Sequence, residues 1–238
     1  PGLTAPKYGL LFSETTLLHC SAVIDERGEA ALEPYLPEGV TLRQCLTARS
    51  AHGPFTTADA SRYFDLAIME HVRKTGSQRG LALLYGREFD ADPNPCVRMA
   101  RDFYRANGID LPAQPISVLP FAHCANGGIR IDRDGATAVP GLYAAGEAAG
   151  GVHGADRHGG AATASCLVFG ARAARAVIRA GAGAAPADGE RALLKMLDWM
   201  DGKARTDARE VLDFLGREMW HQAGVLRDGA RLEILLGE

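Results

Sequence analysis

Short apolar runs separated by turn residues dominate the first half of the chain. The runs at 10–14, 20–24, 81–85 and 115–120 are each bounded by glycine, proline or charged residues, so they predict strands. Between 34 and 54, prolines and glycines follow one another too closely for long elements, which predicts irregular structure.

Two further segments of this half carry apolar residues at helical spacing. Residues 60–72 form one apolar stripe that Gly76 ends, and Thr56 with Asp59 three positions on predicts the helix start through a threonine cap. This amphipathic helix is expected to pack on one face. A second helix is predicted over 92–108, introduced by prolines and closed by an Asn-Gly pair that favours a left-handed cap.

The second half is organised around a glycine-rich stretch. The apolar run 142–145 predicts a short buried strand, the loop after it holds five glycines, and an alanine-rich run predicts a helix over 161–180. Backbone N–H groups at a helix start, with the positive end of the helix dipole behind them, suit an anion or an electron-rich ring. A hairpin is predicted over 128–139, and helical spacing resumes at 190.

Composition and charge exclude several classes of protein. The 238 residues suffice for one large or two small domains, and a formal net charge of −3 without a Lys/Arg-dense face argues against nucleic-acid binding. The five cysteines are scattered and never spaced as CxxC, which is typical of reduced thiols in a cytoplasmic protein and predicts no metal site.

A membrane segment is not expected either, because no run approaches the roughly 18 apolar residues of a membrane helix. The helix over 161–180 instead carries three arginines on a face opposite Leu167, Val168 and Ile178, which is ordinary amphipathicity with a solvated face.

Several motifs together carry a resemblance to a known family. PGLYAAGE at 140–147, VHGADRHGG at 152–160 and LVFG at 167–170 resemble the C-terminal FAD-binding segment of the succinate dehydrogenase, fumarate reductase and L-aspartate oxidase flavoproteins, which reads GLYAxGE, HGANRLG(S/G)NSL and LVFG. HCANGGI at 123–129 resembles the family's HYxMGGI, and MWHQAGVLR at 219–227 resembles its C-terminal helical domain.

The resemblance implies an α/β (α+β) fold, the C-terminal part of an FAD domain of the two-dinucleotide-binding type with an inserted capping domain. Residues 1–114 would form the substrate-capping domain, 115–185 the C-terminal segment of the FAD-binding domain, and 186–238 a C-terminal helical segment. The glycine fingerprint G-x-G-x-x-G that cradles the FAD pyrophosphate does not occur in the chain. A second polypeptide carrying that N-terminal half, and hence a heteromer, is therefore expected.

The resemblance also assigns residues to substrate and cofactor. A hydride would pass between flavin N5 and a small substrate that bears a carboxylate or carbonyl group, with His123 and Arg157 orienting that substrate and Glu14 on the family's catalytic glutamate. Glu147 would accept hydrogen bonds from the ribityl hydroxyls of FAD. The full set of predicted cofactor-binding residues is Gly146, Glu147, Gly154, Gly159, Gly160, Ala161, Ala162 and Thr163.

Two of these residues have a purely structural alternative. His123 could be a histidine at a strand end tied to a backbone carbonyl, and Arg157 could be a loop arginine paired with Asp156. Where this family has Asn-Ser, the chain has Ala161 and Ala162, so backbone N–H groups would supply most contacts to the flavin. The helix N-terminus would then stabilise the negative charge that develops near flavin N1.

Two positions depart from the family pattern. Leu17 falls where the family has an arginine of its proton-delivery relay, and Ala58 stands beside Asp59 where a second arginine donates the proton. The side chains of leucine and alanine can neither donate nor relay a proton. Fumarate reduction by the usual relay is therefore not expected, and a different substrate is favoured. Arg62, which fits the end of the same motif, is expected to hold structure.

Three explanations of the chain follow from the resemblance. It could be one chain of a split flavoenzyme, a piece cleaved from a longer chain, or a binding or structural module that kept the fold and lost the chemistry. We favour the split flavoenzyme, which predicts an apolar surface on this chain that its partner covers.

Overall fold

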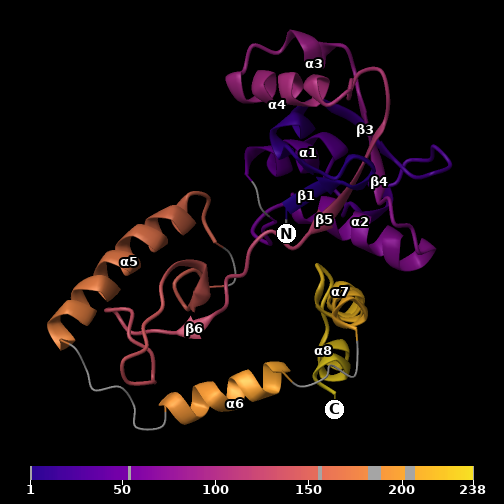
Figure 1. The fold of residues 1–238 in the computed structure, drawn as a ribbon. Helices are drawn as coiled ribbons and strands as arrows, with labels where there is room; N and C mark the ends of the chain where they lie inside the picture. Colours follow the sequence, from indigo (N-terminus) through magenta and orange to yellow (C-terminus); the bar gives the residue numbers. More distant parts are fainter. Residues whose placement is uncertain (1, 53–54, 155–156, 182–188, 202–206, 238) are drawn as a thin grey trace. The chain divides into compact units, whose positions relative to one another are not determined.

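The computed structural model describes residues 2–52, 55–154, 157–181, 189–201 and 207–237. By their contacts these residues form two units, Pro1–Cys124 with His221–Glu238, and Ala125–Trp220 (Figure 1). We call them the first unit and the second unit and describe each by itself.

An antiparallel five-stranded sheet frames the first unit. The strands predicted from the apolar runs are confirmed, and the first of them ends at Phe12. A further strand, β1 (Gly2–Ala5), was not predicted, because its four residues show no alternation of apolar and polar side chains. Alternate residues of the central strands, such as Leu83 and Val118, are fully buried, so one face packs on the core. The strands in spatial order are β2 (Leu10–Phe12), β1 (Gly2–Ala5), β5 (Ile116–Phe121), β4 (Leu81–Tyr85) and β3 (Cys20–Ile24).

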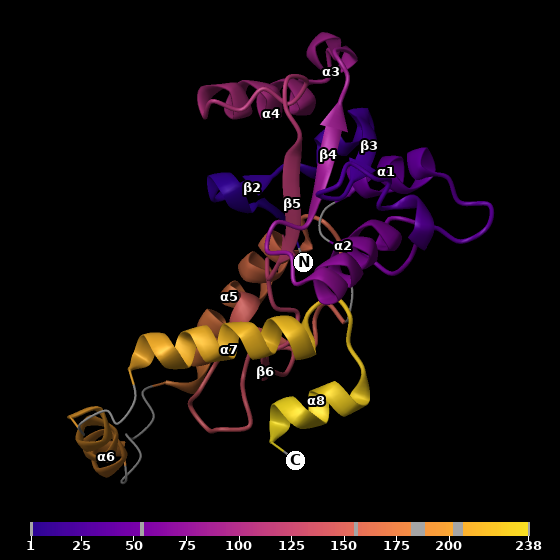
Figure 2. The same ribbon diagram turned by 90° about the vertical axis from the view of Figure 1, so that its right-hand side faces the viewer.

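The first unit also contains helices. They are the 3-10 helices η1 (Pro6–Tyr8), η2 (Glu14–His19) and η3 (Glu33–Tyr35), and the α-helices α1 (Leu42–Ala51), α2 (Arg62–Thr75), α3 (Glu88–Ala91), α4 (Pro95–Ala106) and α8 (Gly229–Leu236). α2 packs on β5 and on α1, and α1 also packs on η2 (Figure 2). Phe64, Ala67 and Ile68 of α2 are fully buried, which confirms the predicted stripe. α4 confirms the second predicted helix, with Asn94 as its N-cap.

The start of α2 differs from the predicted one. α2 begins at Arg62 after the cap position Ser61, and it ends at Gly76, whose φ of 71° confirms the predicted stop. The Thr56 hydroxyl and the Asp59 carboxylate instead each accept a backbone N–H two residues further on. Short polar side chains compete with a helix for backbone donors in this way, so the predicted start at Thr56 is wrong.

The segment 34–54 is more regular than its sequence suggests. It contains α1, whose start is fixed by a capping box: the Thr41 hydroxyl accepts the Gln44 N–H, and the Gln44 side chain accepts the Thr41 N–H. Prolines and glycines lie only on the N-terminal side of this helix and beyond its end, so the prediction of irregular structure is wrong for Leu42–Ala51.

The second unit consists of helices and one very short sheet. Its elements are β6 (Ile129–Arg130), η4 (Gly146–Ala148), β7 (Ala149–Gly150), α5 (Ala161–Ala180), α6 (Gly189–Asp201) and, up to Trp220, α7 (Ala208–Ala223). The short helix η4 packs against α5. The buried residues are small, among them Ala144, Ala149 and Ala173.

The region before α5 contradicts two predictions. β6 pairs in parallel with β7 rather than with 137–139, although the turn at Gly135 is present. The run 142–145 forms no strand, only a single antiparallel bridge from Tyr143 to Ala136. A strand needs neighbouring strands for stability, and within the described residues this run has only that short one.

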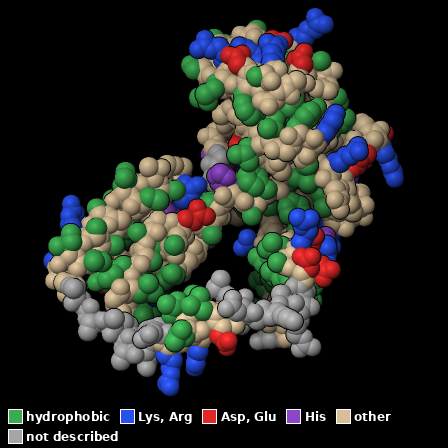
Figure 3. All heavy atoms as spheres, in the orientation of Figure 1, with side chains coloured by type: hydrophobic (Ala, Val, Ile, Leu, Met, Phe, Trp, Pro, Cys, Tyr) green, Lys and Arg blue, Asp and Glu red, His purple; other side chains and the backbone are tan. Residues whose placement is uncertain are grey.

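α5 keeps its predicted bounds but not its predicted packing. Its buried residues are the small Ser165, Ala173 and Ala176, whereas Leu167 and Ile178 are 70% and 79% exposed. Hydrophobic side chains lie along the visible side of this helix (Figure 3). The arginine face is exposed, as expected, but the larger apolar residues of the helix are not packed: the described residues leave them uncovered as well.

α5 also corrects the expectation about membrane segments. By length and composition alone it could cross a membrane, with a mean hydropathy of 1.3 over its best window, of which 11% is buried. Alanines and glycine between the larger apolar residues hide this run from inspection, because no single stretch looks strongly hydrophobic.

Candidate functional site

The predicted cofactor residues begin where η4 packs on α5. Gly146 has a φ of 68°, and a Cβ at this position would lie 3.1 Å from the Cys166 sulfur. A larger residue would be strained and would crowd α5, so the GE turn needs glycine here. This contact places η4, and with it Glu147, against the first half of α5.

Glu147 holds a neighbouring loop by its carboxylate. Its Oε1 accepts the backbone N–H of Ala125 at 3.0 Å, which ties the 125–128 loop to η4. The backbone of Gly128 lies close to the backbone of 148–150. A Cβ at Gly128 would lie 2.5 Å from the Ala148 carbonyl oxygen and 2.9 Å from the Gly150 nitrogen. The predicted Glu147 thus projects from a frame built of bare backbone, and its side chain is exposed.

The N-terminus of α5 presents backbone rather than side chains. Gly160, with a φ of 78°, is the N-cap, and the His158 carbonyl accepts the Ala161 N–H at 3.1 Å. Gly159 and Gly160 are exposed, Ala161 and Ala162 are half-buried, and Thr163 is exposed. Helix N–H groups in such a first turn favour an anion or a developing negative charge.

Arg157 lies in the same loop, just before this helix start. Its side chain is half-buried, and its Nη1 donates to the His158 carbonyl at 3.3 Å. Asp156, the alternative partner, lies outside the described residues. Gly154, with a φ of 61°, lies at the other end of the loop and is exposed. Contact of Arg157 with a substrate stays a prediction.

The other two predicted substrate residues belong to the first unit. His123 follows β5, is exposed, and stands edge-on to the Phe121 ring with centroids 5.7 Å apart. Glu14 is the first residue of η2, and its Oε1 lies 3.6 Å from Nη2 of Arg49. The structure thus gathers the predicted FAD residues and Arg157 in the second unit, and His123 and Glu14 in the first.

Two residues beside Glu14 were not anticipated from the sequence. Arg49 of α1 and Asp65 of α2 have fully buried side chains and form an ion pair, with Nε 2.8 Å from Oδ2. Burial raises the pKa of the Asp65 carboxyl, against the lowering effect of the Arg49 guanidinium. The Thr41 capping box was the available signal, because it places Arg49 on a helix rather than in a loop.

The positions that depart from the family pattern have ordinary surroundings. Leu17 is fully buried in the core beneath η2, and Ala58 is exposed. Arg62 donates to the Thr57 carbonyl at 3.1 Å and lies over the Tyr63 ring. These contacts keep Arg62 within its own segment, which supports the structural role expected for it.

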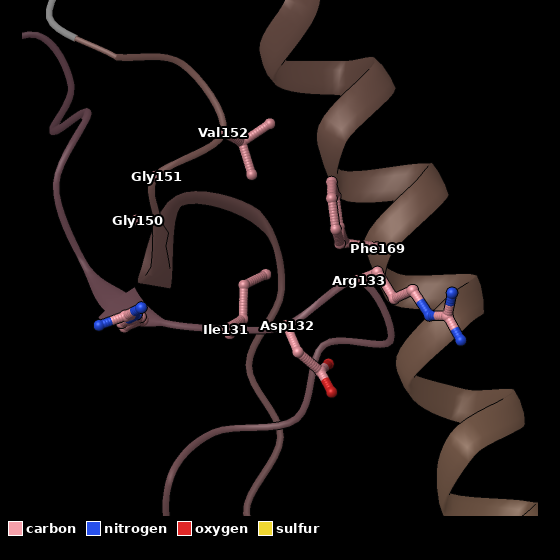
Figure 4. A pocket seen from close by; sticks show the side chains of 8 residues that line it. Ile131, Asp132, Arg133, Gly150, Gly151, Val152 and Phe169 are labelled. Carbon is pink, nitrogen blue, oxygen red and sulfur yellow. The ribbon is translucent and has the colours of Figure 1, made fainter.

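One surface hollow of about 350 Å³ lies in the second unit. Figure 4 shows Val152 of the loop facing Phe169 of α5, with Ile131 at the base. None of the residues predicted for FAD or substrate lines it. The lining residues are Arg130, Ile131, Asp132, Arg133, Gly150, Gly151, Val152 and Phe169. Over the described part of the chain, no three His, Cys, Asp or Glu side chains gather as metal ligands.

Known proteins resemble this chain in sequence. The family described as FAD binding domain matches residues 26–163, more than half of the chain. A fumarate reductase (CoM/CoB) subunit of Methanothermobacter marburgensis is 35% identical over 133 residues, and L-aspartate oxidase of Caulobacter vibrioides is 40% identical over 132 residues. These alignments cover 53% and 55% of this chain but only 24% of each relative.

A solved structure resembles the chain in fold. The FrdA chain of E. coli quinol fumarate reductase superimposes with a TM-score of 0.61 at 22% identity, covering 92% of this chain and 39% of that chain. The match confirms the predicted α/β (α+β) class. Since the alignments with the curated relatives span about a quarter of their length, the present chain corresponds to a part of such a protein.

Proposed function

The chain belongs to the FAD binding domain family, and from this premise we propose that it forms part of a flavin-dependent oxidoreductase acting on a small carboxylate- or carbonyl-bearing molecule. The observation that carries the proposal is the junction of η4 with α5. There the Glu147 carboxylate and the N-terminus of a twenty-residue helix without a side-chain cap lie beside glycines that keep side chains away.

The residues present fit FAD, the cofactor of this family. The Glu147 carboxylate is an acceptor suited to ribityl hydroxyls, and the close backbone approach at Gly128 leaves room only for bare main chain. When bound, FAD supplies the hydride acceptor or donor of the reaction. The N–H groups of Ala161, Ala162 and Thr163 lie at the positive end of α5 and would stabilise negative charge on a ring placed there.

Substrate recognition in this proposal rests on three side chains. The planar guanidinium of Arg157 can hold both oxygens of a carboxylate at once, and His123 can donate to a second carboxylate or a carbonyl. Glu14, partly exposed at the start of η2, is the catalytic carboxylate. In this arrangement residues 1–114 cap the substrate, 115–185 complete the FAD site, and 186–238 form the helical segment.

The first FAD-binding half is, in this proposal, supplied by another polypeptide. The support is the uncovered apolar face of α5, with Leu167 and Ile178 more than two-thirds exposed, and the apolar hollow beside Phe169. Exposed apolar surface of this extent is typical of an interface. The relative from Methanothermobacter marburgensis is named as one subunit of its enzyme, so an assembly has a precedent in the family.

The test is purification of the native complex, followed by mass spectrometry and a visible absorption spectrum. We expect a flavin spectrum and a second polypeptide that carries a dinucleotide fingerprint. Leu167→Glu should abolish their association, whereas Arg175→Glu, which places the same residue on the arginine side of α5, should preserve it. A single longer chain with the flavin would replace the two-chain assembly by a one-chain enzyme. A colourless, homogeneous 25.3 kDa species would refute the oxidoreductase proposal.

A second candidate is a module that retains the fold without the chemistry. It is favoured by the buried Leu17 and the exposed Ala58, which remove both arginines of the usual proton relay. Substrate screening separates the candidates. Flavin reduction or reoxidation by small oxo or carboxylic acids, lost in Arg157→Ala with the flavin spectrum unchanged, supports the enzyme, and the absence of any such reaction in a flavin-loaded complex supports the module.

A further inference from the structure

A single buried guanidinium connects Glu14 to the interior of the first unit. Arg49 of α1 lies between η2 and α2, with Nε 2.8 Å from one oxygen of Asp65 and Nη2 3.6 Å from Oε1 of Glu14. Its Nη1 donates to the His52 carbonyl at 3.1 Å. Asp65 accepts from both Nε and Nη2, the latter at 3.5 Å, and together with the His52 carbonyl it fixes the orientation of the guanidinium plane.

The three side chains differ in their access to solvent. Asp65 and Arg49 are fully buried, whereas 21% of the Glu14 side chain is exposed. The buried carboxylate needs the guanidinium, because an uncompensated charge in the core is strongly destabilising. Asp65 therefore holds Arg49 in place, and Nη2 of Arg49, which also donates to Asp65, lies 3.6 Å from the one carboxylate of the group that a substrate could reach.

Arg49 supplies a charge that the neighbouring sequence does not. The position one turn beyond Glu14 is Leu17, which lies in the core, and Arg62 is bound within its own segment. In the described part of the chain, Arg49 provides the cation within 4.0 Å of the Glu14 carboxylate. The contact comes from a helix that is remote in sequence, so no motif around Glu14 reveals it.

We propose that Arg49, anchored by Asp65, is a positioning residue of the substrate site that orients the Glu14 carboxylate. This inference rests on the proposed function, in which Glu14 acts on the substrate. Arg49 does not itself touch the substrate: its guanidinium holds the Glu14 carboxylate from the side of the protein interior. The site thereby recovers a fixed arginine beside its carboxylate although position 17 is leucine.

The test removes the anchor without leaving a buried charge. The paired change Arg49→Met with Asp65→Leu replaces both ionic groups by apolar side chains of similar volume, which folds tolerate far better than loss of one partner. Arg43→Lys is the matched control, since Arg43 also reaches from α1 to η2 but donates to the Leu18 carbonyl. All variants are made in the flavin-loaded complex, and Glu14→Gln is measured alone and combined with the paired change.

We expect the paired change to lower kcat about tenfold or more while KM and the urea midpoint stay near their wild-type values. Glu14→Gln should lower kcat at least as far, and the combination should lower it no further, because Arg49 acts through Glu14. Arg43→Lys should retain wild-type kcat. An unchanged kcat in the paired variant, or losses that multiply with those of Glu14→Gln, would overturn the proposal.

A second measurement keeps this inference separate from the proposed function. If the flavin-loaded wild-type complex reduces or oxidises no substrate, the oxidoreductase proposal fails, and urea unfolding of the 238-residue chain then decides the role of Arg49. A double-mutant cycle between Glu14→Gln and the paired change should show a coupling of about fivefold in the unfolding constant. Strict additivity of the two effects would show that Arg49 does not hold Glu14.

Discussion

Gly128→Ala tests whether the frame around Glu147 depends on close backbone approach. A Cβ at Gly128 would lie 2.5 Å from the Ala148 carbonyl oxygen and 2.9 Å from the Gly150 nitrogen. Both atoms belong to the backbone, so no flexible side chain can move aside. The adjacent Gly127 is the matched control, because a Cβ there meets nothing within 4 Å and its φ is not positive.

The size of the effect follows from that distance. Ordinary contact begins at 3.4 Å, so the two backbones must separate by 3.4 − 2.5, or 0.9 Å. Overpacking of this kind costs about 1–3 kcal/mol. That range corresponds to a decrease of about 5- to 150-fold in the equilibrium constant for pairing of β6 with β7. The pair consists of only two residue partners on each strand, Ile129 with Ala149 and Arg130 with Gly150, so it cannot spread the strain.

Hydrogen exchange followed by mass spectrometry measures this opening directly. In Gly128→Ala, peptides covering β6 and β7 should exchange faster by that factor, while peptides from β4 and β5 of the first unit keep their protection. The affinity of the complex for FAD should fall in parallel, since the frame of Glu147 is displaced. Gly127→Ala should leave both measurements unchanged. Equal protection of β6 in the two variants would refute the reasoning.

Three further predictions concern single side chains. Glu147→Ala should weaken FAD binding about tenfold in a fluorescence titration, because it removes a carboxylate acceptor and releases the backbone N–H it holds; unchanged affinity would exclude a cofactor role. The Asn94 N–H and then the His19 ring lower the pKa of the Asp92 carboxyl, so its contribution to stability is present above its unfolded pKa and is lost as the pH falls through the lower folded value. The gap in urea midpoint between wild type and Asp92→Asn should therefore be wide at neutral pH and close below about pH 4, and a gap independent of pH would contradict this. Tyr104→Phe removes the hydroxyl that accepts a backbone N–H just before η2 at 2.6 Å, so it should cost about 1–3 kcal/mol in the free energy of unfolding, and a neutral change would show that water replaces that bond.

The sequence by itself determined the elements whose signals are local. α5 was predicted with its correct bounds, and α4 was marked by Asn94 and its following proline, because caps and helical spacing act within a few residues. The family resemblance rested on contiguous motifs at 140–170, and the matching family confirms it together with FAD as the cofactor. The roles of Glu14, His123 and Arg157 stay predictions.

Only the tertiary structure decided which distant segments meet. Glu14 and Arg49 are remote in sequence, and their contact depends on α1 packing against η2. β6 found its partner in β7 rather than in the adjacent segment, and Leu167 stayed exposed because the described residues offer nothing to cover it. Helix propensity and helix capping depend on neighbours along the chain. Strand pairing and side-chain burial depend on neighbours in space, and these cannot be read from a local stretch of sequence.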